Sequence, residues 1–200
     1  MDKLQRRCGC SQRQENEVSS NGRRTVLTGA MALALSPLAA SAADPAKARA
    51  QAGDLLVYTQ GDQQGQVVKV DDLKVGEAPQ FVFPMDPATK TVRDGLRVNQ
   101  AIVVRLDASK LGSSTKPHAV DGVVAYSAIC THYGCLITTT HEDGNAVVCN
   151  CHGSTFDAGN NGAILIGPAE RRLALLPLKS VDGAIVVAAG FNGRIGPPQA

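Results

Sequence analysis

The sequence predicts an all-β protein, and three observations support this prediction. Short apolar runs rich in Val and Ile, most of them four to seven residues long, recur along the chain. Turn-forming Gly, Pro, Asp or Asn bound most runs, and 20 Gly and 10 Pro supply many such positions. No stretch repeats its apolar residues at the spacing of an amphipathic helix, so strands are favoured over helices.

The predicted elements follow in chain order. A short helix is expected near Asp71–Val75, where Val-Asp-Asp-Leu-Lys could mark a helix start. The turn Glu142-Asp143-Gly144-Asn145 indicates a hairpin between two strands. The runs expected to form strands are Gln66–Val70, Phe81–Phe83, Ala101–Leu106, Val123–Ala128, Ala146–Val148, Ala163–Ile166, Leu173–Leu178 and Ala184–Ala189.

The first 42 residues differ in kind from the rest. Residues 1–22 are polar and charged, and Arg23-Arg24 stands directly before an apolar run. Ala40-Ser41-Ala42 at the end of that run is typical of a cleavage site. The arginine pair resembles a twin-arginine export signal, so we expect a periplasmic protein with a signal segment at 1–42, a linker at 43–53 and a domain at 54–200.

A second interpretation of the leader stays open. Residues 25–42 could remain as an anchor in the inner membrane, although about 18 residues is the lower limit for a spanning helix. Whether the leader is cleaved is therefore undecided, and so is any role of Cys8 and Cys10 upstream of the arginines.

The charge balance argues against a nucleic-acid partner. From Ala43 onward the chain carries 14 Lys and Arg against 15 Asp and Glu, while the leader carries 6 against 3. The basic excess of the whole chain thus belongs to the leader, and no basic stripe or set of stacking aromatics is present. No Ser/His/Asp arrangement, phosphate loop or pair of carboxylates stands out, so no catalytic residue is assigned and the chain alone is not expected to convert a substrate.

Two short segments combine cysteine with histidine. Thiolates and imidazoles together ligate either zinc or an iron–sulfur centre. Zinc sites favour C-x2-C pairs, whereas the near pairs here are C-x-H and C-x2-H, each followed by a glycine that suggests a tight turn aiming N–H groups at cluster sulfurs. The segments are Cys130-Thr131-His132-Tyr133-Gly134-Cys135 and Cys149-Asn150-Cys151-His152-Gly153-Ser154.

These segments resemble the Rieske family pattern C-x-H-x-G-C … C-x-C-H-G-S at every fixed position. The resemblance implies one [2Fe–2S] cluster, with Cys130, His132, Cys149 and His152 as its ligands and a disulfide between Cys135 and Cys151. It also implies an antiparallel sandwich or barrel base domain with a small inserted cluster-binding β subdomain, here about residues 126–170.

The resemblance extends to residues that tune the cluster. Ser154 occupies the position whose hydroxyl reaches a bridging sulfide, and Phe156 stands where quinol-oxidising members carry a Tyr. Gly167-Pro168 resembles the proline loop that covers the cluster from a third side. His118 and His141 lie in polar, loop-like sequence and are expected to be solvated surface residues.

The chain further resembles the small subunit of arsenite oxidase, through Val123–Ile129, the Phe81-Val82-Phe83-Pro84 stretch and the twin-arginine leader. That resemblance implies a partner pair: a large molybdenum-containing catalytic subunit as electron donor and a small periplasmic acceptor such as a c-type cytochrome. The alternative is the iron–sulfur subunit of a cytochrome bc complex, which meets quinol and usually keeps its membrane anchor. A Rieske ferredoxin is a third reading, opposed by the leader and by the inner Cys pair.

Overall fold

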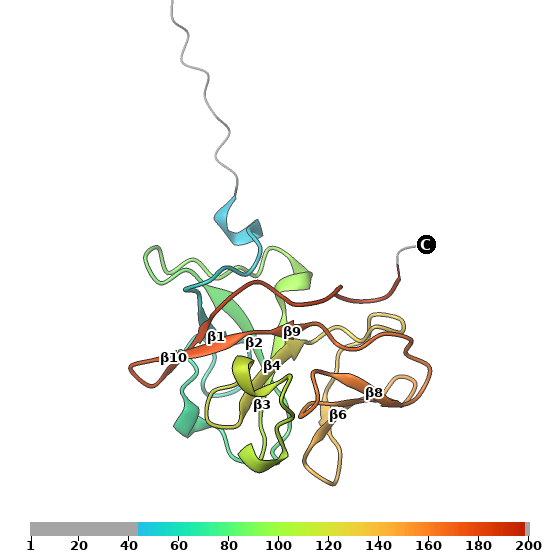
Figure 1. Ribbon diagram of the computed structural model, residues 1–200. Coiled ribbons are helices and arrows are strands. Elements are labelled where there is room, and N and C mark those ends of the chain that lie inside the picture. Colours follow the sequence, from blue (N-terminus) through green and yellow to red (C-terminus); the bar gives the residue numbers. More distant parts are fainter. Residues whose placement is uncertain (1–43, 199–200) are drawn as a thin grey trace, which may run out of the picture. The chain divides into compact units, whose positions relative to one another are not determined.

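The computed structural model describes residues 44–198, and this part of the chain is built from β-strands and short 3-10 helices (Figure 1). The predicted all-β class is confirmed. The strands are β1 Leu55–Tyr58, β2 Gln80–Met85, β3 Ala101–Arg105, β4 Val123–Ser127, β5 Thr139–Thr140, β6 Ala146–Cys149, β7 Ser154–Asp157, β8 Ala163–Ile166, β9 Leu175–Leu176, β10 Leu178–Val181 and β11 Ala184–Val187. The 3-10 helices are η1 Pro45–Lys47, η2 Val70–Asp72, η3 Arg97–Asn99, η4 Ala108–Lys110 and η5 Lys116–His118.

The predictions for the twin arginines, the apolar run 25–42 and the pair Cys8 and Cys10 fall outside the described residues. Within residues 44–198, no helix is long and apolar enough to cross a membrane.

Seven strands form the larger, antiparallel sheet in the order β10-β11-β1-β2-β3-β4-β9. Its two edge strands, β9 and β10, are separated in the chain by Pro177 alone, so the sheet curls until its edges are joined covalently. Proline interrupts the strand there because it has no N–H to donate to a neighbour. The result is a nearly closed barrel, in agreement with the expected base domain.

The second sheet holds four antiparallel strands in the order β5-β6-β7-β8. It lies within the segment predicted to bind a cluster, and the expected hairpin turn joins β5 to β6. Because β4 enters this segment from the barrel and β9 returns to it, the small sheet is an insertion between two neighbouring strands of the large one (Figure 1).

Several predicted elements differ from those observed. Strands β1, β5 and β7 were not predicted. The run Leu173–Leu178 contains β9 and only the first residue of β10, so most of β10 was not predicted either. The run Gln66–Val70 forms only isolated bridges, from Val67 to Val57 and from Lys69 to Ala184. The helix expected near Asp71–Val75 is the single 3-10 turn η2, in which Asp72 accepts a hydrogen bond from the backbone N–H of Lys69.

Two hydrophobic cores flank the large sheet, and β3 contributes to both. Ala101 and Val103 enter the core inside the barrel, whereas Ile102 and Val104 enter the core shared with the small sheet. Successive side chains of a strand point to opposite faces, so β3 is apolar throughout because both of its faces are covered. The shared core also contains Cys130 and Cys149, and it therefore anchors the candidate ligands to the barrel.

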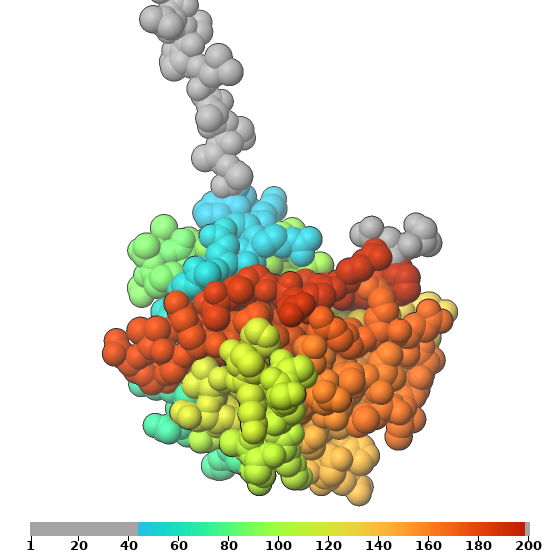
Figure 2. All heavy atoms as spheres, in the orientation of Figure 1, coloured from blue at the N-terminus to red at the C-terminus, as the bar shows by residue number. Residues whose placement is uncertain are grey.

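The chain ends on the surface of this domain. We call residues 190–198 the C-terminal tail; it follows β11, pairs with β9 through Asn192 and Leu175, and continues past the loop after β4 (Figure 2). At the other end, residues 44–53 are bonded to the barrel: Arg93 donates to the Pro45 carbonyl and Asn99 to the Ala48 carbonyl.

Candidate metal centre

Two loops of the inserted segment bring the predicted ligands together. The first follows β4 and carries Cys130 and His132, and the second joins β6 to β7 and carries Cys149 and His152. Both loops turn in the same way: Gly134 donates its N–H to the Cys130 carbonyl at 3.0 Å, and Gly153 to the Cys149 carbonyl at 2.9 Å. The glycines thus close the turns around each cysteine.

The tight turns expected from the two glycines are present, and in both of them the glycine N–H donates to a carbonyl oxygen. The backbone N–H of His132 lowers the pKa of the Cys130 thiol. Gly134 has a φ of 77°, in the left-handed region, which explains why a glycine ends the turn.

The two candidate thiol ligands lie at the base of the loops. Cys130 and Cys149 are each 1% exposed, and neither is in a disulfide. Burial raises the pKa of the Cys130 thiol, while hydrogen bonds from the His132 N–H and the Ser154 side chain oppose this rise. A pair of sulfurs with these donors is suited to hold a cation that compensates the buried negative charge.

The two candidate imidazole ligands lie nearer the surface. The His132 and His152 rings are 4.8 Å apart between centroids and perpendicular to each other. His132 is half-buried and His152 exposed. Nδ1 of His132 is buried and has no hydrogen-bond partner among the described residues. Buried polar atoms are rarely left unpaired, so this nitrogen fits the role of a metal ligand.

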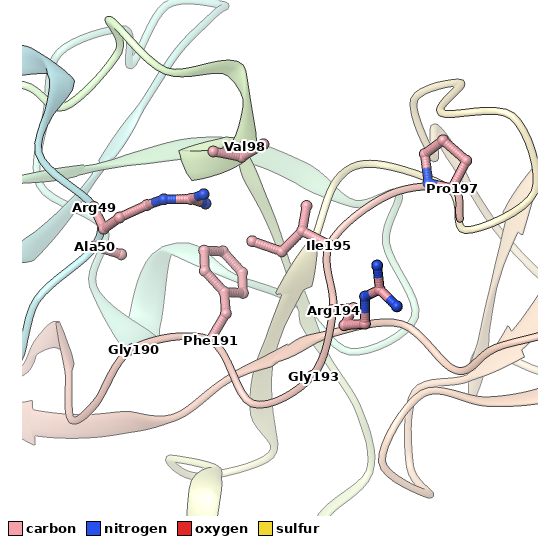
Figure 3. Close-up of a pocket in the computed structure, with 9 residues that line it drawn as sticks. All are labelled: Arg49, Ala50, Val98, Gly190, Phe191, Gly193, Arg194, Ile195 and Pro197. Carbon is pink, nitrogen blue, oxygen red and sulfur yellow. The ribbon is translucent and has the colours of Figure 1, made fainter. Parts of the chain in front are cut away.

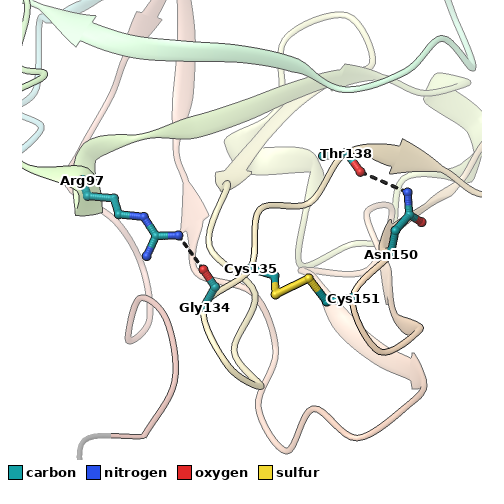
Figure 4. Close-up of a disulfide and its surroundings, with 6 residues drawn as sticks. All are labelled: Arg97, Gly134, Cys135, Thr138, Asn150 and Cys151. Carbon is teal, nitrogen blue, oxygen red and sulfur yellow. Dashed lines mark hydrogen bonds between the residues drawn. A yellow bond between two sulfur atoms is a disulfide. The ribbon is translucent and has the colours of Figure 1, made fainter.

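A disulfide between Cys135 and Cys151 joins the two loops, as the resemblance implied (Figure 4). Asn150 adds a second connection by donating to the hydroxyl oxygens of Thr138 and Thr139 at 3.1 and 2.7 Å. The disulfide lowers the conformational entropy of the unfolded chain. It therefore stabilises the folded arrangement of both ligand pairs. The pairing also leaves only Cys130 and Cys149 free for a metal in the described chain.

Gly167 and Pro168 form the third loop, beside the second one. Gly167 has a φ of 96°, and a Cβ there would lie 2.6 Å from the Cα of Ser154. Only glycine therefore allows the two backbones to approach this closely. A hydrogen bond also joins the third loop to β7: the Ala169 N–H donates to the Ser154 hydroxyl at 3.2 Å.

Ser154 and Phe156 lie in β7, and both are fully buried. Phe156 packs in the shared core that contains Cys130 and Cys149. The two other histidines lie elsewhere: His141 is exposed beside Asp143 in the β5–β6 turn, and His118 ends η5.

Sequence reasoning missed residues that hold the first loop from outside. Arg97 donates to the Gly134 carbonyl at 2.6 Å (Figure 4), and the Thr131 hydroxyl donates to the Arg171 carbonyl at 2.6 Å. Tyr133 was also missed; it is 73% exposed and its ring centroid lies 4.1 Å from that of His132. A large exposed aromatic beside a candidate ligand was visible in the sequence motif, but the arginine contacts depend on long-range folding.

The donor set thus consists of two buried thiols and two imidazoles near the surface, carried by loops that a disulfide fixes. Such a set fits a [2Fe–2S] cluster with mixed ligation, and on chemistry alone it also fits zinc. The pattern of fixed residues around the donors separates the two possibilities.

Comparison with known proteins makes that separation. Residues 63–179 match the family model described as the Rieske [2Fe-2S] domain. A protein of Haloferax mediterranei, provisionally named the Rieske subunit of a respiratory nitrate reductase, is 33% identical over 147 residues, which are 70% of this chain and 63% of that protein. The Rieske iron-sulfur subunit of the cytochrome bc1 complex of Streptomyces lividans is 38% identical over 78 residues, 38% of this chain and 46% of that protein.

The chain therefore spans less than two thirds of the length of these relatives. Among solved structures, the plasma membrane Rieske protein PetC3 of Synechocystis PCC 6803 aligns with 25% identity and a TM-score of 0.39, covering 60% of this chain and 95% of that chain. The match to the family model includes both Cys/His loops and the third loop.

Proposed function

The chain belongs to the Rieske [2Fe–2S] domain family, and from this premise we propose that it is the electron-transfer subunit of a molybdenum-containing oxidoreductase resembling arsenite oxidase. Its cofactor is a Rieske [2Fe–2S] cluster. When bound, that cluster supplies a reversible one-electron couple, at a potential well above that of an all-Cys ferredoxin. We assign the ligands as Cys130 and Cys149 on one side and His132 and His152 on the other.

The residues of this chain have two tasks in such a carrier. The first is to exclude water from the thiols, which Cys130 and Cys149 satisfy by their burial in the shared core. The second is to bring the electron within reach of a partner, and His152 and the neighbouring Tyr133 are exposed at the tip of the loops. Neither task needs a catalytic side chain, which agrees with a chain that relays electrons for a catalytic centre elsewhere.

The extent of the similarity supports a molybdenum partner. The relative named for a respiratory nitrate reductase aligns over 147 residues, so its similarity includes much of the barrel as well as the cluster loops. The Streptomyces lividans alignment covers 78 residues, about half as many. Respiratory nitrate reductases and arsenite oxidases both belong to the molybdenum enzymes. The substrate of the partner enzyme is proposed by resemblance alone, and a c-type cytochrome is the proposed acceptor.

The iron–sulfur subunit of a cytochrome bc complex is the second candidate. It is favoured by the cytochrome bc1 relatives and by a hollow of about 630 Å³ beside His132 that is lined by Tyr133 and Pro168. Phe156 opposes it, because the quinol-oxidising proteins that the chain resembles carry a Tyr at this position.

We also propose that the protein is periplasmic and follows the twin-arginine route. Arg23-Arg24 before the apolar run supports this location, and so does the disulfide, since disulfides persist in oxidising compartments. Retention by residues 25–42 in the inner membrane remains the alternative.

Purification under native conditions tests the proposed partner. For this test an affinity tag is added to the C-terminus. Mass spectrometry identifies the copurifying proteins, and a separate assay measures molybdenum. We expect a large subunit and molybdenum in the same peak as this chain. A cytochrome b in that peak, without molybdenum, would replace the proposal by the second candidate.

A further inference from the structure

Five arginines gather along the C-terminal tail, although the sequence scatters them over 146 positions. Arg171 donates to the Gly196 carbonyl at 2.8 Å, and Arg172 to the Asn192 side chain at 3.1 Å. Three more line the hollows beside the tail. These are Arg49, Arg97 and Arg194.

These side chains carry more positive charge than the acidic residue lining the hollows beside the tail, Glu170, can compensate. Within residues 44–198, none of the five guanidinium groups forms an ion pair with a carboxylate. Those that are bonded donate to carbonyl or amide oxygens, which carry no charge. By contrast, Arg93, which precedes η3 in the sequence, is paired with Asp54 at 2.8 Å. Because the chain after the leader is nearly neutral, with 14 basic and 15 acidic residues, this face is a positive area on an otherwise balanced surface.

Three hollows follow the tail and connect these arginines to the candidate cluster loops. In the first, of about 460 Å³, Arg49 reaches over Phe191, and Arg194 lies on the other side of Ile195 (Figure 3). The second shares Val98, Ile195 and Pro197 with the first and adds Arg97. The third shares Pro197 with both and contains His132.

From this arrangement we propose that the tail face, defined by residues 190–198 and the five arginines, docks an acidic region of a redox partner protein. The inference rests on the proposed electron-transfer function and names the chemistry of the partner's surface. One electron passes between the partner's redox group and this chain, and no covalent bond forms or breaks.

Two features favour a folded acidic protein over an anionic membrane. The arginines flank hollows with apolar floors, such as Phe191 and Ile195, which fit protruding side chains of a partner. The row of hollows also ends at His132 and Tyr133, where an electron-exchanging partner must approach. Oppositely charged surfaces accelerate such encounters and fix their orientation.

The test uses the cluster-loaded protein and two double variants that each remove two positive charges. Arg49→Gln with Arg194→Gln changes the tail face, and both side chains are exposed without hydrogen bonds in the described part of the chain. Lys116→Gln with Lys179→Gln is the matched control away from the tail, on η5 and β10. The acidic probe is a reduced plant-type ferredoxin, the basic probe is a mitochondrial-type cytochrome c, and stopped flow gives second-order rates at low and high ionic strength.

With the ferredoxin, we expect the wild-type rate to fall about tenfold or more as salt shortens the range of the charges. The tail variant should lower the low-salt rate about three- to tenfold and flatten the salt dependence, while the control variant stays close to wild type. Equal effects of the two variants would overturn the proposal. So would a rate that is faster at low than at high salt only with the basic cytochrome.

A binding assay with vesicles that contain phosphatidylglycerol tests the alternative that the tail face binds an anionic membrane. If the tail variant lost vesicle binding but kept the wild-type rate with ferredoxin, the tail face would be a membrane-binding surface and the proposal would be wrong. Failure of the underlying function looks different: the purified protein would then lack iron, acid-labile sulfide and a reduced-state EPR signal. A loaded cluster with unchanged potential and a charge-insensitive rate would refute the docking surface alone.

Discussion

Individual buried side chains near the thiols are expected to set the redox potential. The Ser154 side chain lowers the pKa of the Cys130 thiol. Phe156 packs in the core that contains Cys130 and Cys149, and its side chain has no hydrogen-bond donor. Hydrogen bonds to cluster sulfurs stabilise the reduced, more negative state. We therefore expect a potential inside the Rieske range of about −150 to +300 mV but below that of members with a Tyr.

Two substitutions test this tuning by protein-film voltammetry. Phe156→Tyr should raise the potential and Ser154→Ala should lower it, each by about 40 mV if one net hydrogen bond of about 1 kcal/mol is involved. If Phe156→Tyr only destabilises the fold and leaves the potential unchanged, Phe156 is core packing and the tuning argument is wrong.

Tyr58 offers a test of burial in the barrel that does not involve the cluster. Its side chain is 3% exposed, and its hydroxyl has no hydrogen-bond partner among the described residues. Burial, with a smaller contribution from Asp72, raises the pKa of Tyr58 to about 12 from an ordinary value of 10.0. The folded state therefore favours the neutral phenol, and this contribution to stability is complete below pH 10 and lost as the pH rises towards 12.

Tyr58→Phe should be at least as stable as wild type at pH 7, because it removes an unpaired buried hydroxyl. Between pH 10 and 12 the variant should lose less stability than wild type, by about 2 kcal/mol at the upper end. Denaturant unfolding at several pH values measures both effects. Parallel stability curves for the two proteins would show that the phenol is not held neutral by the fold.

At the scale of elements, the loop Gly167-Pro168 depends on one glycine. An Ala side chain at 167 meets the backbone of Ser154, whereas at Gly65, with a φ of 79°, it meets nothing within 4 Å. Gly65→Ala is therefore a matched control for the strain of positive φ alone, of order 1 kcal/mol. Gly167→Ala should cost clearly more in unfolding free energy and should shift the EPR signal, because it displaces the loop beside the cluster. Equal costs for the two variants would mean that the close approach is unimportant.

Some strands could be predicted from the sequence and others could not. The strands at Ala163–Ile166 and Ala146–Val148 were predicted because Val and Ile, which favour strands, make up much of them. Ser154–Asp157 was not, since Ser, Thr and Asp look like loop residues; this strand forms by pairing with β6 and β8. The run Gln66–Val70 has the strand pattern but makes only single bridges, because its neighbours β1 and β11 are already paired to each other.

The candidate site was easier to predict than the surface around it. Its four donors and the disulfide lie in two short segments with fixed spacing, so local sequence was enough. The five arginines of the tail face come from four places in the chain, and only the fold brings them together.

For the whole molecule, export depends on the leader. Changing Arg23 and Arg24 together to Lys keeps the charge but removes the twin-arginine signal. We expect the variant to accumulate in the cytoplasm, as cell fractionation and immunoblotting would show, while the wild type reaches the periplasm. Unchanged export would eliminate the twin-arginine route, and a mature N-terminus near Ala43 would favour cleavage over a retained anchor.

Two thiols and two imidazoles are assigned as the ligands of one Rieske cluster, and EPR of the reduced, purified protein tests this assignment. We predict a rhombic signal with an average g below the free-electron value, together with two irons and two acid-labile sulfides per chain. His132→Ala and His152→Ala should each abolish this signal, since alanine supplies no ligand. A normal signal in either variant, or zinc in place of iron in the wild type, would contradict the account.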